Sequence, residues 1–148
     1  MSIILFGILG AIISALVGMV WYSMKTPMGR VHMKSMGMGD MTPEERMKMM
    51  KDTASKMRRY YFGQFILSFL TSAFVAFIMK EQKDYGVSAS AVYPEIISIW
   101  LCFTVPTIGQ ALIWGNIDSK LRWKKFFSDI FGNLLIYLGI IFVFSLFI

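Results

Sequence analysis

Four long stretches without a charged side chain dominate this sequence and limit the folds open to it. They cover residues 3–24, 60–79, 96–117 and 130–148. Each is close to the ~20 residues that an α-helix needs to cross the hydrocarbon core of a bilayer. We therefore predict an all-α membrane protein with four transmembrane helices, folded as a single domain.

The composition excludes several other classes of protein. Hydrophobic residues make up 56% of the 148 residues and charged residues 16%, whereas soluble domains are about 25% charged. A lone cysteine, Cys102, rules out a disulfide framework within one chain. No nucleophile–histidine–carboxylate set or phosphate-binding glycine loop stands out, so we expect no enzyme and no resident cofactor.

The loops differ in charge, and this difference predicts the orientation. Segments 25–59 and 118–129 are rich in lysine and arginine, whereas segment 80–95 is slightly acidic. Because cytoplasmic loops collect basic residues, we expect both basic segments inside and both termini outside a cell inner membrane. The net charge of +6 is then explained by orientation and contact with anionic lipid, so we expect no nucleic-acid partner.

Two features inside the apolar stretches concern how the helices pack. The first stretch places small residues at alternating four- and three-residue steps, a spacing that puts them on one helix face and favours close helix contact. These candidates for helix packing are Gly7, Ala11, Ser14 and Gly18. In the third stretch, Pro106 predicts a kink, and Thr104, Thr107 and Gln110 are able to bond to the freed backbone. The kink is either a packing bend or the wall of a small cavity.

The segment between the first two stretches holds most of the 13 methionines. Within it, Thr42-Pro43-Glu44-Glu45 has the pattern of a helix start, with Thr42 as N-cap. We predict an amphipathic helix over about 43–57 on the inner membrane surface or beneath the bundle.

The methionines also allow two functional interpretations. Thioether sulfur is a preferred ligand of Cu(I), and the candidate metal ligands are Met28, His32, Met33, Met36 and Met38. A flexible methionine-rich surface is alternatively suited to docking a protein partner, whose identity the sequence leaves open. Lipid contact and helix packing also explain the segment, without Cu(I) binding or a protein partner.

Aromatic residues mark the predicted membrane boundaries, with Trp21, Tyr22 and Trp123 as candidate interface anchors. The run Gly18-Met19-Val20-Trp21-Tyr22-Ser23, the turn Gly29-Arg30-Val31-His32-Met33 and the motif Trp100-Leu101-Cys102-Phe103 resemble an uncharacterised four-span bacterial membrane family, domain of unknown function 1761. His32 stands where that family commonly has tryptophan. The resemblance implies the fold and topology and no activity.

Two functions are consistent with these patterns. The first is a structural or interaction role as a homo-oligomeric helical bundle that associates through the small-residue face of the first helix. The alternative is a small transport or Cu(I)-handling protein that uses the Met/His-rich segment or an oligomeric pore.

Overall fold

The computed structural model describes the backbone of residues 2–115 and 117–148, and the side chains of these residues apart from 50, 55–57, 89 and 90. Most of the described residues are helical and none of them forms a strand, which confirms the predicted fold class. The elements are α1 (Ile3–Trp21), α2 (Pro27–Ser35), α3 (Pro43–Asp52), α4 (Ala54–Asp84), α5 (Ala89–Ile99), the π-helix η1 (Trp100–Thr104), α6 (Val105–Ile113) and α7 (Ser119–Ser145).

Four spans are long and apolar enough to cross a membrane, which confirms their predicted number. They cover Ile3–Trp21, Arg58–Asp84, Ala91–Ile113 and Ser119–Ser145. The first ends three residues earlier than predicted, because the backbone leaves the helix at Tyr22. Helices α4 and α7 extend well beyond the uncharged stretches, since charged residues are good helix formers outside the bilayer.

The amphipathic helix begins where the sequence predicts but ends sooner. The hydroxyl of Thr42 accepts the N–H of Glu45, and the Glu45 carboxylate accepts the N–H of Thr42, which completes a capping box. Helix α3 ends at Asp52, and the hydroxyl of Thr53 donates to the carbonyl of Met49 over 2.7 Å. Such bonding competes with the helical ladder. The prediction of one helix over 43–57 was therefore wrong at its end, since residues 54–57 open α4.

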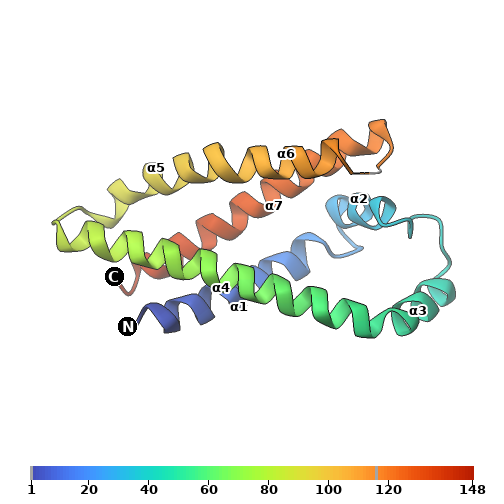
Figure 1. Ribbon diagram of the computed structural model, residues 1–148, viewed down its shortest axis with the longest axis horizontal. Coiled ribbons are helices and arrows are strands. Elements are labelled where there is room, and N and C mark those ends of the chain that lie inside the picture. The colour runs from blue at the N-terminus through green and yellow to red at the C-terminus, as the bar shows by residue number, and fades with distance from the viewer. Residues whose placement is uncertain (1, 116) are drawn as a thin grey trace.

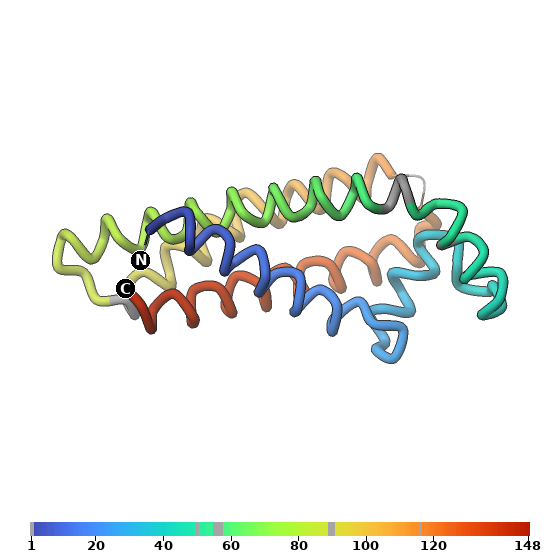
Figure 2. Tube along the Cα trace, turned by 90° about the horizontal axis from the view of Figure 1, so that it is seen from below, coloured from blue at the N-terminus to red at the C-terminus, as the bar shows by residue number. Residues whose placement is uncertain are grey.

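Helices α1, α4 and α7 pack together, while the α5–η1–α6 span contacts α4 at one end and α7 at the other (Figure 1). Both termini lie beside the α4–α5 loop (Figure 2). We call this the terminal end of the bundle. Helices α2 and α3 lie at the opposite end, which we call the basic end because it carries both lysine- and arginine-rich segments.

The apolar core occupies the half of the bundle nearer the terminal end. Its fully buried members come from α1, α4, α5 and α7, and the rings of Phe6 and Phe144 meet edge to face with centroids 4.6 Å apart. The core residues are Phe6, Val75, Ala76, Met79, Val92, Ile96, Ile140, Ile141 and Phe144. Close packing on this side leaves the more polar residues of the spans in the other half.

The third span is interrupted in its middle. The N–H of Val105 bonds to the carbonyl of Trp100, five residues back, so the chain forms a π-helix instead of a continuous α-helix. Pro106 follows directly and has no N–H to donate. The hydroxyl of Thr107 donates to the carbonyl of Phe103 over 2.6 Å, which satisfies one carbonyl near the break.

Candidate functional site

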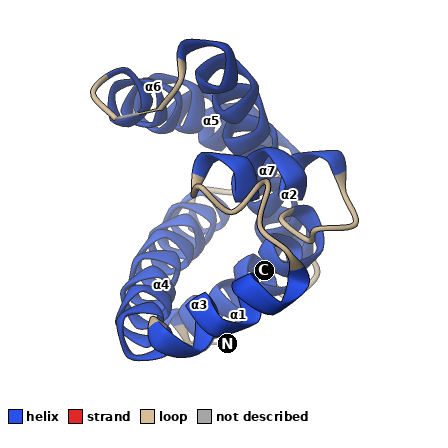
Figure 3. Ribbon diagram, turned by 90° about the vertical axis from the view of Figure 1, so that its right-hand side faces the viewer, coloured by secondary structure: helices blue, strands red, loops and turns tan. Residues whose placement is uncertain are grey.

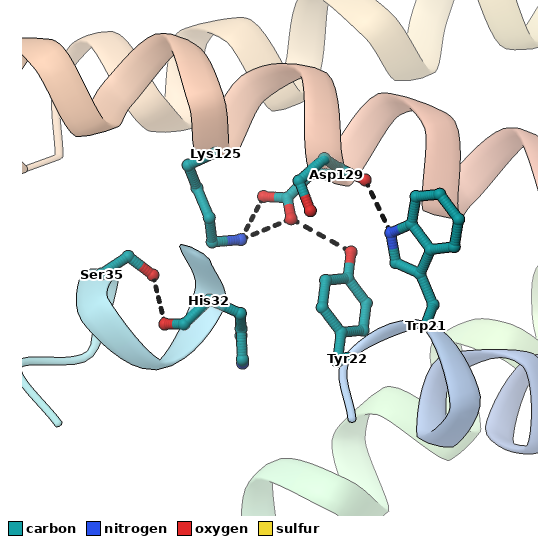
Figure 4. Close-up of polar contacts among 7 residues, drawn as sticks. Trp21, Tyr22, His32, Ser35, Lys125 and Asp129 are labelled. Atoms are coloured by element: carbon teal, nitrogen blue, oxygen red, sulfur yellow. Dashed lines mark hydrogen bonds and ion pairs between the residues drawn. The ribbon is translucent and has the colours of Figure 1, made fainter. Parts of the chain in front are cut away.

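A cluster of polar side chains joins α1, α2 and α7 at the basic end (Figure 4). The indole N–H of Trp21 donates to the carbonyl of Ser128 over 3.0 Å. Gly132, one turn further along α7, makes room for the indole, because a Cβ there would lie 2.6 Å from the ring. The hydroxyl of Tyr22 donates to Oδ1 of Asp129 over 3.0 Å. The end of α1 is thus fixed to α7 by two successive residues.

Asp129 also forms an ion pair with Lys125, one turn earlier on α7. The side chains are only 12% and 17% exposed for Lys125 and Asp129. The Lys125 ammonium lies 5.7 Å from the centre of the Tyr22 ring. Burial, reinforced by the charge and the hydrogen bond of Asp129, raises the pKa of Tyr22 above its ordinary value. Tyr22 therefore stays protonated and donates to the carboxylate at any physiological pH.

Helix α2 contributes His32 to the same cluster. Its ring centroid lies 4.8 Å from that of Tyr22. Burial and the nearby Lys125 charge lower the pKa of His32, while Asp129 acts in the opposite direction. The Nδ1 atom is buried and has no hydrogen-bond partner in the described part of the chain. These surroundings therefore favour the neutral form of the His32 ring.

Local chemistry holds α2 in this place. The hydroxyl of Thr26 caps the helix by accepting the N–H of Gly29 over 2.9 Å, and it donates to the carbonyl of Trp21. A Cβ at Gly29 would lie 1.9 Å from the carbonyl oxygen of Ser23. Only glycine therefore allows α2 to fold back this closely on the end of α1.

A second polar region lies deeper in the bundle, as a cavity of about 420 Å³. Helices α4 and α6, which lie apart in the view along the bundle (Figure 3), both contribute lining residues. The lining side chains carry hydroxyl, amide or apolar groups and no charge. They are Ser14, Gln64, Leu67, Ser68, Thr71, Phe103, Thr104, Thr107, Ile108, Asn133, Ile136, Tyr137 and Ile140.

One buried polar atom of this cavity has no partner in the described structure. The amide oxygen of Asn133 is buried and accepts no hydrogen bond among the described residues. A buried polar group without a hydrogen-bond partner in the hydrocarbon of a membrane destabilises the fold by roughly several kcal/mol. The lining residues Gln64, Leu67 and Thr107 are exposed, so the cavity opens between α4 and α6. The apolar core closes it toward the terminal end.

The predicted kink residues do not line the cavity themselves. Pro106 and Gln110 are exposed on α6, whereas Thr104 and Thr107 are among the lining residues. Of the polar residues that the sequence places beside Pro106, Thr104 and Thr107 therefore line the cavity and Gln110 does not.

The small-residue face of α1 is occupied within the chain. Gly7, Ala11 and Ser14 are buried, and a Cβ at Gly7 would lie 2.6 Å from the ring of Phe69 on α4. Gly10, which the sequence analysis did not select, is closer still, since its Cβ would lie 2.2 Å from Oγ of Ser72. Gly18 lies outside this contact, with no atom within 4 Å of a Cβ. A second copy would have to use another surface.

The proposed metal ligands lie in different surroundings. His32 contacts the ring of Tyr22, Met33 lines a pocket with three cationic side chains, and Met38 is buried. Met28 is half-buried, and Met36 is 36% exposed. Among the described residues, no group of three histidine, cysteine or acidic side chains is placed to hold a metal. Cu(I) binding by these five residues stays a prediction.

The three predicted aromatic anchors also lie in different surroundings. Trp123 is 65% exposed, as a residue at a lipid interface should be. Trp21 and Tyr22 instead direct their polar atoms to α7. The sequence analysis missed Lys125 and Asp129, although their i, i+4 spacing on a helix was a usable signal.

The sequence profile of the family described as "Protein of unknown function (DUF1761)" matches residues 5–142, so the chain belongs to this family. No curated protein and no solved structure reached a significant match. The motifs that carried the resemblance fall at structurally special places. Trp21-Tyr22 forms the contact with α7, and Trp100–Phe103 makes up most of the π-helix.

Proposed function

We propose that this membrane protein binds a small uncharged polar molecule in the cavity between α4 and α6 and carries it across the membrane. The observation that carries the proposal is the buried amide oxygen of Asn133, which has no partner among the described residues. Hydrocarbon tails offer no hydrogen bond, so the occupant must supply a donor. The uncharged lining favours a neutral molecule, because an ion in this part of the membrane would need a charged partner.

The cavity is closed by packing toward one end of the bundle. The cavity lies toward the basic end, and the apolar core fills the bundle toward the terminal end. By the distribution of lysine and arginine, we place the basic end in the cytoplasm and both termini outside an inner membrane. The cavity would then lie in the inner half of the membrane, open between α4 and α6, and transport would require the core to part. The role needs no catalytic step and no nucleic-acid partner.

The test is solute flux in proteoliposomes, followed by light scattering after an osmotic gradient of glycerol or urea. We expect flux above that of protein-free vesicles and a loss of most of it in Asn133→Leu. Gln110→Leu is the matched control, because it removes an amide that is exposed on α6 outside the cavity. Absence of protein-dependent flux for both solutes, or equal loss in both variants, would refute the proposal.

A second candidate is the homo-oligomeric interaction role, now through the same cleft. The cavity opens sideways between two helices, so a helix of a second copy is an alternative source of the missing donor. Native mass spectrometry in mild detergent distinguishes the two functions. A discrete oligomer that dissociates in Asn133→Leu, together with no solute flux, would favour the interaction role.

A further inference from the structure

Helices α2 and α3 form a second pocket at the basic end, separate from the cavity in the spans. It has a volume of about 190 Å³. Its lining residues are Met24, Arg30, Met33, Lys34, Gly39 and Arg46. Three of the six are cations, and none is acidic.

The position of Arg46 is fixed by its surroundings. One terminal nitrogen donates to the carbonyl of Gly39 over 3.3 Å, and the other lies 3.9 Å from the sulfur of Met24. Its Nε is buried and has no partner in the described structure. Gly39 permits this arrangement, because a Cβ there would lie 2.6 Å from the side chain of Lys34. The guanidinium is therefore held in place with a donor to spare.

The charges of the pocket are not compensated within the described part of the chain. The one ion pair among the described residues joins Lys125 to Asp129, both on α7 and outside the pocket. Glu45, the acidic residue next to Arg46, is engaged in the capping box with Thr42. Three like charges brought together without a carboxylate repel one another, and an anion relieves that repulsion.

We infer that this pocket binds a phosphate group. A guanidinium offers planar paired donors that match phosphate oxygens, and a lysine adds a mobile charge. Met24 and Met33 supply an apolar wall next to the end of the first span, at the level where lipid headgroups lie. The phosphate belongs either to an anionic lipid or to a free phosphate compound. This inference does not depend on the proposed transport function.

The experiment is native mass spectrometry of the full chain in mild detergent. One arm adds phosphatidylglycerol against phosphatidylcholine, and the other adds inorganic phosphate alone. We expect phosphatidylglycerol or phosphate to bind in whole-number steps and Arg46→Gln to weaken the binding by about tenfold, as expected for losing a charge-assisted bidentate contact. Binding of phosphatidylglycerol alone identifies a headgroup, whereas binding of inorganic phosphate identifies a free ligand.

Arg59→Gln is the matched control, since Arg59 is exposed on α4 outside the pocket. Because Arg46 also bonds to Gly39, a second variant, Arg30→Gln, removes an exposed cation that makes no such bond. It should weaken binding as well, with circular dichroism unchanged. Equal effects of Arg59→Gln and the two pocket variants, or no binding of either probe above phosphatidylcholine, would overturn the inference.

Discussion

The hydroxyl of Tyr22 donates to Oδ1 of Asp129 over 3.0 Å, across 107 positions of the chain. This bond and the adjacent one from Trp21 to the carbonyl of Ser128 join the end of the first span to the start of the last. They lie one turn of α7 from Asn133, which lines the cavity. The polar cluster therefore joins α1 and α7, both of which contribute lining residues to the cavity.

The bond between Tyr22 and Asp129 should be measurable as a coupling. Tyr22→Phe keeps the ring against His32 but removes the donor, and we expect the free energy of unfolding to fall by about 1.5–3 kcal/mol, the range for a hydrogen bond to a charged group. Asp129→Asn should cost more, because it also leaves the largely buried Lys125 ammonium without its charged partner. A double-mutant cycle by denaturant unfolding in mixed micelles checks this. Additive effects would contradict the coupling.

Gly29 should be irreplaceable, although it lies in a helix. Gly29→Ala brings a methyl group to 1.9 Å from the carbonyl oxygen of Ser23, so α2 has to move away from the end of α1. We expect much faster limited proteolysis between residues 22 and 42. The control is Gly63→Ala in α4, where no atom lies within 4 Å of a Cβ. That change should be neutral or stabilise the helix by about 0.5–1 kcal/mol. Similar proteolysis of both variants would refute this view of Gly29.

The close approach of α1 and α4 predicts a difference between two glycines of one helix. Gly10→Leu places atoms where Oγ of Ser72 already lies, 2.2 Å from the first of them. We expect a loss of about 1–3 kcal/mol or more from overpacking. Gly18→Leu should be tolerated, since the space around Gly18 is open. Thermal unfolding in detergent compares the two, and a larger effect at Gly18 would move the helix contact to another face.

The lowered pKa of His32 predicts a pH dependence of stability. In the unfolded chain His32 takes up a proton near the ordinary histidine pKa of 6.5, but in the folded chain it does so only at a lower pH. Between these values the unfolded state binds more protons, so stability falls as the pH falls, and it is fully present above 6.5. Because the chain has one histidine, His32→Phe should remove this dependence over roughly pH 5 to 7. The measurement is the midpoint of thermal unfolding as a function of pH. A wild-type midpoint that does not change with pH would exclude the effect.

Some of the site was within reach of the sequence and some was not. The capping box at Thr42 and Glu45 depends on four consecutive residues, and the interruption of the third span depends on Pro106, so both could be predicted. Asn133 was visible as a polar residue in an apolar stretch, but its lack of a partner depends on which side chains of three other helices approach it. The same holds for Arg46, whose pocket joins two helices separated by an irregular turn.

The sequence by itself determined the class of protein, the number of spans and the basic character of one end. These depend on local hydrophobicity and charge, which act through the bilayer irrespective of how the helices pack. Only the tertiary structure decided which faces meet. It placed the small residues of α1 against α4, paired Tyr22 with Asp129, and left a polar cavity beside the π-helix. Inside a membrane the hydrophobic effect gives no preference among apolar faces, so close packing and hydrogen bonds between distant residues make that choice.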